Sequence, residues 1–424
     1  MTEYLNETVF TWGGVPLKFG AGAVDEIGHD LGQQGASRVL IITDPRVAAG
    51  GVPQRVADAA TAAGLTVEVY DRVHIEPTDE SLAEAVEFAR QSAWDGFIGV
   101  GGGSAIDTAK AVNLLTTHPG ELHDYLNKPI GEGKTPPGPL KPLVAVPTTA
   151  GTGSESTPVC VLDLLGLKVK TGISHPRLRP TLAVADPLLT LDLPPAVTAA
   201  SGMDVLCHAL ESYTAKPYSA FPRHSPETRV AYCGSNPISD MWAEQTLRLI
   251  GRAFRAAVLT GGNLAARTDM MLAATFAGMG FGNAGVHIPH ACGYPIAGMV
   301  RDYVPDGYPP EPLVPHGQSV SLTAPATFRF TYPTDPDRHL RAAELLAPGA
   351  VRQPDPREQL PAVLAELMRD IGIPNGTAAV GYTEADTEQL VAGALKQQRL
   401  LNVAPRAVGA EDLAAIFRES RTNW

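Results

Sequence analysis

The first half of the chain alternates short apolar runs, rich in β-branched residues, with amphipathic helical patterns. The apolar runs predict strands at 38–43, 66–71, 96–103 and 142–149. Helical patterns lie at about 50–63 and 81–93. Strands separated by helices form βαβ units, whose parallel sheet is covered by helices on both faces. We therefore expect a Rossmann-like α/β domain over residues 1–195.

From about residue 196 the pattern changes to long helical stretches rich in alanine and leucine. These stretches cover 195–214, 237–259, 264–281, 356–372 and 384–399. Two proline-rich insertions, 217–237 and 301–315, lie between them. A chain of 424 residues is long enough for two domains of ordinary size. We expect an all-helical second domain over residues 196–424.

The composition excludes several kinds of partner. With 44% hydrophobic and 18% charged residues, the chain resembles a folded soluble protein. Its net charge of -12 argues against nucleic acids and anionic membranes, and its apolar runs are too short to span a membrane. The segment MTEYLNETVF lacks the layout of a signal peptide, and the four cysteines form no CxxC pair. We expect a cytoplasmic protein.

The segment GFIGVGGGSAIDTAKAV joins a buried strand to a helix through three glycines. The helix is predicted to start at Ser104, and Ser104 and Asp107 have the spacing of a capping box. Backbone N–H groups at Gly102 and Gly103 could approach a bound anion, and the helix terminus adds partial positive charge. The pattern predicts a pyrophosphate site. Since the run is not a regular GxGxxG fingerprint, a plain tight turn is an equal alternative.

A second polar loop, PTTAGTGSEST (147–157), follows the predicted strand at 142–149 and offers the hydroxyls of Thr148, Thr149 and Ser154. Open α/β sheets bind nucleotides beside such loops, at the carboxyl ends of neighbouring strands. Asp44 follows another strand, where it could accept hydrogen bonds from a ribose and repel a 2′-phosphate. That role would favour NAD over NADP. The alternative is a turn-forming aspartate before proline.

Residues 202–213, GMDVLCHALESY, place Asp204 and His208 one turn apart on one face of an apolar helix. Such a pair alone is more often a buried hydrogen-bonded couple than a metal site, because burial requires that each partner be satisfied. Further histidines occur in GNAGVHIPHACGYP (His287 and His290) and in LVPHGQS (His316). One carboxylate and three imidazoles suit iron or zinc, with one position left open for substrate.

In this order, GGGSAIDTAKA, PTTAGTGSE, GMDVLCHALE, HACGYP and PHG resemble the iron-containing (group III) alcohol dehydrogenase family over about residues 10–420. Within the family, YCGSNPISDMWA (232–243), FAGMGFGNAGVH (276–287) and LVPHGQSV (313–320) are most similar to hydroxyacid–oxoacid transhydrogenases. The resemblance implies a dehydroquinate synthase-like fold and a homo-oligomer, a dimer.

The resemblance also implies residue roles. The implied metal ligands are Asp204, His208, His290 and His316. The implied dinucleotide-binding residues are Gly102, Gly103, Ser104, Asp107, Thr148, Thr149 and Ser154, with Lys170 near the ribose. Many family members carry a second histidine, thought to relay protons, four residues after the third ligand, where this chain has Tyr294. His287, one turn before His290, is a candidate substitute, and a structural histidine is the alternative.

The implied reaction is hydride transfer linked to NAD (or NADP) and to Fe²⁺ (or Zn²⁺). A transhydrogenase keeps its NAD bound, with 4-hydroxybutyrate as donor and 2-oxoglutarate as acceptor. The first alternative is an ordinary NAD(P)H-dependent alcohol dehydrogenase or aldehyde reductase that releases its cofactor, and the second is a silent binding protein. A carboxylate substrate requires a cation, for which the candidates are Arg223, Arg229 and Arg301, although a solvated surface arginine is the favoured interpretation of each.

Overall fold

The computed structural model describes residues 5–118, 120–167, 169–230 and 232–424. Contacts along the chain divide it into two compact units. The α/β unit is Gly13–Leu191, and the helical unit is Asp192–Trp424 together with the amino-terminal segment that ends at Trp12. The assignment of dinucleotide binding to the first unit and metal binding to the second remains a prediction.

The α/β unit is built on a six-stranded parallel sheet with the order β1-β8-β5-β4-β2-β3. Its strands are β1 (Leu17–Phe19), β2 (Arg38–Ile42), β3 (Thr66–Tyr70), β4 (Gly96–Gly101), β5 (Leu143–Pro147) and β8 (Leu182–Ala185). The four predicted strands are β2 to β5, and each ends one or two residues before its predicted limit. The strands β1 and β8 were not predicted, since they are only three and four residues long. The α/β fold class is confirmed.

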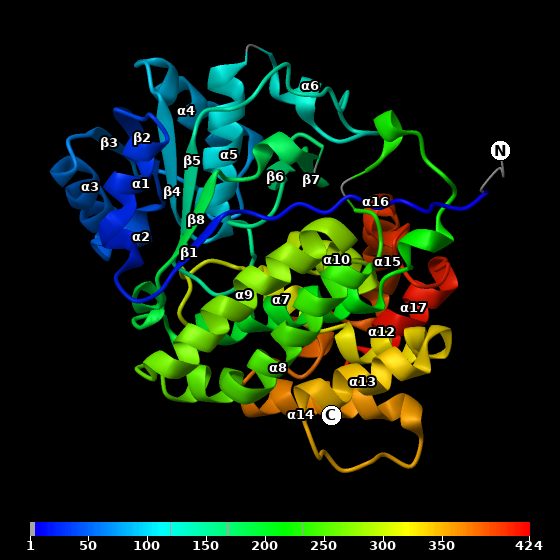
Figure 1. The fold of residues 1–424 in the computed structure, drawn as a ribbon. Helices are drawn as coiled ribbons and strands as arrows, with labels where there is room; N and C mark the ends of the chain where they lie inside the picture. Colours follow the sequence, from blue (N-terminus) through cyan, green and yellow to red (C-terminus); the bar gives the residue numbers. More distant parts are fainter. Residues whose placement is uncertain (1–4, 119, 168, 231) are drawn as a thin grey trace. The chain divides into compact units, whose positions relative to one another are not determined.

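Helices cover both faces of this sheet, as Figure 1 shows. They are α1 (Ile27–Gln33), α2 (Pro45–Ala49), α3 (Val52–Ala62), α4 (Asp79–Arg90), α5 (Gly103–Thr117) and α6 (Leu122–Tyr125). Alternate residues of one strand enter different cores, because successive side chains point to opposite faces. Leu40 and Ile42 of β2 pack with residues of α4 and α5, and Val39 and Ile41 pack with residues of α1 and α3. Burial on both faces explains why these strands are continuous apolar runs.

An antiparallel hairpin, β6 (Val159–Leu164) with β7 (Val169–Ser174), lies apart from the main sheet in the same unit. It was not predicted. Several of its residues are only half-buried, so that it lacks the apolar runs that mark the central strands. The hairpin pairs Asp163 with Lys170.

The helical unit confirms the prediction of an all-helical second half. Its helices are α7 (Pro195–Thr214), α8 (Pro237–Leu259), α9 (Leu264–Ala284), α10 (Ile288–Gly298), α11 (His316–Ser321), α12 (Ala324–Thr331), α13 (Pro336–Leu346), α14 (Gln359–Asp370), α15 (Thr387–Leu395), α16 (Gln398–Leu401) and α17 (Ala410–Glu419). The pattern at 384–399 predicted one helix, and the structure divides it between α15 and α16. Within the described ranges, no helix combines the length and apolar character needed to cross a membrane.

Helix α7 is the central helix of this unit. It begins with Pro195 at its first turn, and every residue from Gly202 to Thr214 is buried. The helices α8, α9, α10, α11 and α13 all contact it. Each polar side chain on a helix that is buried on every side needs a hydrogen-bond partner or a ligand. On α7 the buried charged or titratable side chains include Asp204, His208 and Glu211.

The amino-terminal segment is held against the helical unit. Asn6 forms an antiparallel bridge with Pro222, and the Glu7 N–H donates to the Phe221 carbonyl at 2.9 Å. The indole Nε1 of Trp12 donates to the Met279 carbonyl at 3.2 Å. From Leu5 to Trp12 the chain therefore belongs to the helical unit; it then forms the α/β unit and returns to the helical unit at Asp192.

Candidate functional site

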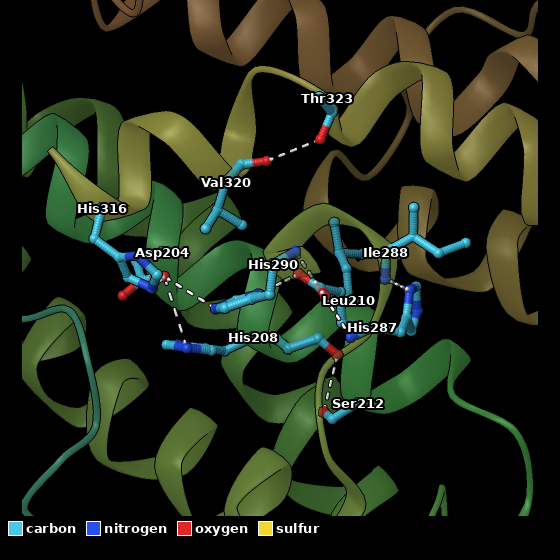
Figure 2. Close-up of polar contacts among 12 residues, drawn as sticks. Asp204, His208, Leu210, Ser212, His287, Ile288, His290, His316, Val320 and Thr323 are labelled. Carbon is cyan, nitrogen blue, oxygen red and sulfur yellow. Dashed lines mark hydrogen bonds and ion pairs between the residues drawn. The ribbon is translucent and has the colours of Figure 1, made fainter. Parts of the chain in front are cut away.

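The four predicted metal ligands converge on one oxygen atom, Oδ1 of Asp204. The Nε2 atoms of His208, His290 and His316 lie 3.6, 3.5 and 3.8 Å from this oxygen. Asp204 and His208 come from α7, His290 from α10, and His316 is the first residue of α11 (Figure 2). Asp204, His290 and His316 each offer an atom within 4.8 Å of the other two. The four side chains implied as ligands therefore lie together, and metal binding by them remains a prediction.

The close packing of α11 on α7 brings His316 to this point. A Cβ atom at Gly317 would lie 2.1 Å from the Ala200 carbonyl oxygen and 2.7 Å from the Asp204 Cβ. Only glycine permits this approach without displacing backbone. His208 is held differently, because its ring stacks on Phe281 with the ring centroids 3.8 Å apart and the planes at 8°. Both contacts limit how far the imidazoles can move.

The atoms at the centre of this cluster fit a divalent metal. Their separations exceed hydrogen-bond lengths, and the buried atoms Asp204 Oδ1 and His290 Nε2 have no hydrogen-bond partner in the described part of the chain. Burying a carboxylate oxygen without a partner is costly, and a cation between the oxygen and the imidazoles removes this cost. One carboxylate and three imidazole nitrogens form a donor set for iron or zinc.

The charge states of Asp204 and His208 agree with this fit, whereas at His290 burial acts to lower the pKa but Glu211 and Asp204 raise it to about 9. Burial alone would raise the pKa of Asp204, but the three imidazoles around it hold that pKa well below its usual range. Burial lowers the pKa of His208 to about 3, against the opposing effect of Asp204. At neutral pH the cluster therefore presents an ionised carboxylate, and at His208 a neutral imidazole.

Glu211 lies in direct contact with His290 of this cluster, and the sequence analysis missed it. Its side chain is fully buried, and Oε1 lies 2.6 Å from His290 Nδ1. Oε2 accepts the backbone N–H of His287 at 2.6 Å and that of His290 at 3.4 Å. A signal was present, because Glu211 follows Asp204 by seven residues and His208 by three, and so lies on the same face of α7.

The two predicted relay residues have different surroundings. Nδ1 of His287 accepts the Ile288 N–H at 2.8 Å, and Nε2 lies 3.0 Å from Thr214 Oγ1, so the ring caps the start of α10. Figure 2 shows this ring directed away from His316. Tyr294 instead lies beside His316, with the ring centroids 5.9 Å apart. The structure brings Tyr294 to the cluster and does not bring His287; a catalytic role for either remains a prediction.

In the α/β unit, the glycine turn lies where it was predicted. The strand β4 ends at Gly101, Gly102 is the N-cap of α5 without a side-chain hydrogen bond, and the helix begins at Gly103. A Cβ atom at Gly103 would lie 2.7 Å from Cγ2 of Thr152, so that the second predicted loop packs against the first. The turn leaves the first N–H groups of α5 without a side-chain cap, which fits an anionic pyrophosphate.

The predicted capping box at Ser104 and Asp107 is wrong. Ser104 Oγ accepts the Glu76 N–H at 3.1 Å, and Asp107 Oδ2 accepts the Val161 N–H at 2.9 Å. Both side chains are thus engaged by other segments and are not used at the helix terminus. Spacing alone could not reveal these distant partners.

Asp107 and Ser154 belong instead to a buried polar cluster around Lys110, which the sequence analysis did not single out. The Lys110 ammonium group, with no exposed surface, donates to Ser154 Oγ at 2.7 Å and to the Val159 carbonyl at 2.6 Å. It also contacts Asp107 Oδ1 at 3.2 Å and Thr157 Oγ1 at 3.3 Å. This cluster ties α5 to the second loop. The predicted cofactor contacts of Asp107 and Ser154 remain predictions.

The remaining predicted dinucleotide residues lie near the same turn. Thr148 is buried and donates its N–H to the Gly101 carbonyl, and a Cβ at Gly102 would lie 3.6 Å from Thr149 Oγ1. Asp44 caps α2 through Oδ1, while a Cβ at Gly101 would lie 3.4 Å from its Oδ2. Asp44 therefore forms the turn that was the alternative prediction, and its second oxygen lies at the end of β4.

Lys170 pairs with two carboxylates of its own unit. Its Nζ lies 2.5 Å from Glu76 Oε2 and 2.9 Å from Asp163 Oδ2. Burial acts to lower the pKa of Lys170, but these two carboxylates raise it above its usual value. Two of the candidate arginines also have acidic partners: Arg229 lies 3.5 Å from Glu7 Oε1, and Arg301 pairs with Asp386.

A parallel α/β unit with a glycine turn, and a helical unit with a buried carboxylate–imidazole cluster, define a metal-dependent, dinucleotide-linked oxidoreductase. The sequence-family model for iron-containing alcohol dehydrogenase matches residues 16–187. The family model for the C-terminal part of Fe-containing alcohol dehydrogenases matches residues 223–421. The chain belongs to the iron-containing alcohol dehydrogenase family. It is an enzyme, an oxidoreductase.

Similar proteins agree on this family. The chain is 49% identical over 411 residues to a hydroxyacid-oxoacid transhydrogenase, mitochondrial, of Bos taurus, covering 95% of this chain and 88% of the relative. The human protein of that name is 48% identical over 413 residues, with the same coverage. Among solved structures, a 1,3-propanediol oxidoreductase has a TM-score of 0.85 at 32% identity, covering 97% of this chain and 100% of the other. A sulfoacetaldehyde reductase from Bifidobacterium kashiwanohense, in complex with NAD+, has a TM-score of 0.81 at 26% identity, covering 97% and 98%.

The expectation of a cytoplasmic location is contradicted by these names. The relatives from Bos taurus, Rattus norvegicus and Mus musculus, and a probable one from Dictyostelium discoideum, are all named as mitochondrial. Scattered cysteines without a CxxC pair indicate a reducing compartment, and they do not say which reducing compartment it is.

Proposed function

We propose that this enzyme is a hydroxyacid–oxoacid transhydrogenase, which moves hydride from a hydroxyacid to bound NAD and from there to an oxoacid. The observation that carries the proposal is the convergence of three imidazole Nε2 atoms within 3.5–3.8 Å of Asp204 Oδ1. The names of relatives at 46–49% identity support the choice of substrates. As donor and acceptor we propose 4-hydroxybutyrate and 2-oxoglutarate, which yield succinate semialdehyde and 2-hydroxyglutarate.

In this proposal Asp204, His208, His290 and His316 hold Fe²⁺, with Zn²⁺ as the alternative ion. Held by these residues, a divalent metal would supply Lewis-acid polarisation of the alcohol or carbonyl oxygen of the substrate. The chain supplies the geometry, since the ligands project from α7, α10 and α11, which pack against one another. Tyr294, beside His316, is better placed than His287 to exchange a proton with substrate or solvent.

The α/β unit is proposed to hold the dinucleotide at the start of α5. Backbone N–H groups at Gly102 and Gly103 bind the pyrophosphate, and the helix terminus adds favourable partial charge. Asp44 Oδ2 accepts a hydrogen bond from a ribose hydroxyl. The same carboxylate would repel a 2′-phosphate, so we propose NAD as the preferred cofactor and NADP as the lesser one.

We also propose that the enzyme is a homodimer that acts on small molecules and binds neither nucleic acid nor membrane. The net charge of -12 supports the last part, because nucleic acids and anionic lipids select basic surfaces. Sedimentation equilibrium tests the dimer, and a single species with the mass of one chain would contradict it.

A labelled-substrate assay tests the reaction. Iron-reconstituted enzyme is incubated with 2-oxoglutarate and with 4-hydroxybutyrate that carries deuterium on C4, without added nucleotide. We expect the deuterium at C2 of 2-hydroxyglutarate, because bound NAD carries the hydride from one acid to the other. Product that forms only with stoichiometric free NADH, and without transfer of deuterium, would reject the transhydrogenase.

The second candidate is an ordinary alcohol dehydrogenase or aldehyde reductase that exchanges its cofactor. The solved structures named 1,3-propanediol oxidoreductase and alcohol dehydrogenase from Oenococcus oeni, both with a TM-score of 0.85, favour it. The labelled assay separates the two candidates, since an exchanging enzyme requires free NADH for every turnover.

A further inference from the structure

Glu211 engages both the side chain and the backbone of the segment that carries His290. It lies on α7, and its two oxygens face the start of α10. Oε1 contacts Nδ1 of His290 at 2.6 Å, while Oε2 accepts the N–H of His287 at 2.6 Å and that of His290 at 3.4 Å. A fully buried carboxylate that receives three donors from one short segment fixes the position of that segment relative to α7.

These contacts determine which nitrogen of His290 carries a proton. An ionised carboxylate only accepts hydrogen bonds, so Nδ1 of His290 must be the donor. When the ring is neutral, the lone pair then lies on Nε2. This atom is 3.5 Å from Asp204 Oδ1 and has no hydrogen-bond partner among the residues that the structure describes. The tautomer set by Glu211 is the one that offers a ligand atom to the cluster.

We propose that Glu211 is a positioning residue of the metal site, which fixes both the tautomer of His290 and the start of α10. This inference rests on the proposed function, since it takes Asp204 and the three imidazoles to hold the metal. A carboxylate behind a metal-binding imidazole orients the ring and raises its basicity. Glu211 also supplies a second buried negative charge, on the far side of His290 from Asp204, so that two carboxylates contribute to balancing a divalent cation.

Glutamine at position 211 separates this role from simple packing, because it has nearly the same shape. If its amide oxygen accepts the His290 Nδ1–H, its NH₂ group faces the backbone N–H of His287, and two donors oppose each other. If the amide is turned, its NH₂ donates to Nδ1, and the proton of the ring moves to Nε2. Either arrangement disturbs the lone pair that faces Asp204. Packing volume, by contrast, is unchanged.

The test is Co²⁺ binding to the full chain after removal of metal with a chelator. The dissociation constant is measured by competition with a coloured chelator, and the visible spectrum of the bound ion reports its ligand geometry. We compare wild type, Glu211→Gln and the control Ser212→Ala. Ser212 is the next residue of α7, fully buried, and its hydroxyl donates only to the Ala209 carbonyl. Circular dichroism establishes that each variant is folded.

We expect Glu211→Gln to bind Co²⁺ about 10- to 100-fold more weakly than wild type and with an altered spectrum. Ser212→Ala should match wild type in both measurements. Equal affinity and an unchanged spectrum in Glu211→Gln would overturn the positioning role while leaving the proposed function intact. Failure of the wild-type chain to bind Co²⁺ would instead overturn the proposed function, and this inference with it.

A measurement on the wild type covers the case in which Glu211→Gln does not fold. The zinc-loaded chain is labelled with ¹⁵N-histidine, and the signals of His290 are identified by their loss in His290→Asn. We expect the proton on Nδ1, with Nε2 bound to zinc. A proton on Nε2 would overturn the inference, because Glu211 would then not determine the tautomer.

Discussion

Each unit of this enzyme contains a buried cluster of charged and polar side chains, and the two clusters differ in how they are satisfied. Around Lys110, every donor finds an acceptor within 3.3 Å, including Ser154 Oγ and the Val159 carbonyl. Around Asp204, the central oxygen and His290 Nε2 remain without a hydrogen-bond partner in the described ranges. Both clusters are expensive to bury. A buried cluster whose polar atoms all have partners stabilises the fold. A buried cluster that contains unpartnered polar atoms is suited to binding a ligand.

The largest effect is expected from removal of a cluster ligand. His208→Ala should abolish both metal retention and turnover, because only three of the four proposed ligands would remain. Elemental analysis and the labelled-substrate assay measure these losses, and nucleotide binding by the α/β unit should persist. His29→Ala, a change at an exposed histidine, is the control. Normal turnover in His208→Ala would show that the ligand set is misassigned.

For the Lys110 cluster, whose polar atoms are all paired, we expect a loss of stability without a loss of metal. Lys110→Met removes the cation that pairs with the buried carboxyl group of Asp107, which should lower the free energy of unfolding by about 3–5 kcal/mol. Chemical denaturation measures the loss. Metal content of the folded fraction should not change. The exposed lysine at 396 provides the matched control, Lys396→Met. If Lys110→Met kept its full free energy of unfolding but lost metal, the proposed difference between the two clusters would be wrong.

A smaller effect is expected at the glycine turn. In Gly103→Ala the new methyl group would lie 2.7 Å from Thr152 Cγ2, so the two loops must move apart. We expect NAD affinity to fall about tenfold, since a shift of this size costs of order 1.4 kcal/mol of binding free energy. Isothermal titration calorimetry measures it. Adding Thr152→Ala should restore part of the NAD affinity. If it restores none, the close contact between the new methyl group and Thr152 is not the cause of the loss.

The smallest effect is expected at Asp44. Asparagine is as good a helix N-cap as aspartate, so Asp44→Asn should preserve stability while removing the charge that opposes a 2′-phosphate. The ratio of NADP to NAD affinity should rise several-fold, by about 1 kcal/mol or less. Fluorescence titration with both reduced cofactors measures the ratio. Asp58→Asn, at an exposed acid in the same unit, should leave it unchanged.

The sequence indicated the carboxylate–imidazole cluster more completely than the polar contacts of the glycine turn, and the reason is physical. Asp204 and His208 are marked by polarity inside an apolar helix, which is unusual enough to notice in one dimension. Lys110 gives no such signal, because a lysine in an amphipathic pattern is normally exposed. Its burial depends on partners 44 to 49 residues away. The false capping box has the same origin, since Ser104 is bound by a residue 28 positions distant.

The short strand β1 and the docking of the amino-terminal segment were also not predicted from the sequence. The central strands β2 to β5 carry their apolar character on both faces and could be recognised, whereas β1 is three residues long and only half-buried. Nothing in the amino-terminal residues indicated that Trp12 would donate to a carbonyl 267 positions later. Contacts between residues so far apart in the sequence depend on the tertiary structure and leave no local pattern in the sequence.

The return of the chain to the helical unit has a consequence for how this protein can be dissected. Cutting between residues 191 and 192 yields a carboxyl-terminal fragment without the segment that ends at Trp12, and an amino-terminal fragment that carries this segment without its docking surface. During synthesis, likewise, Trp12 leaves the ribosome long before Met279 exists. The α/β unit is thus an insertion within the helical one, and separating the two requires excision of residues 13–191 with both flanking segments kept in one chain.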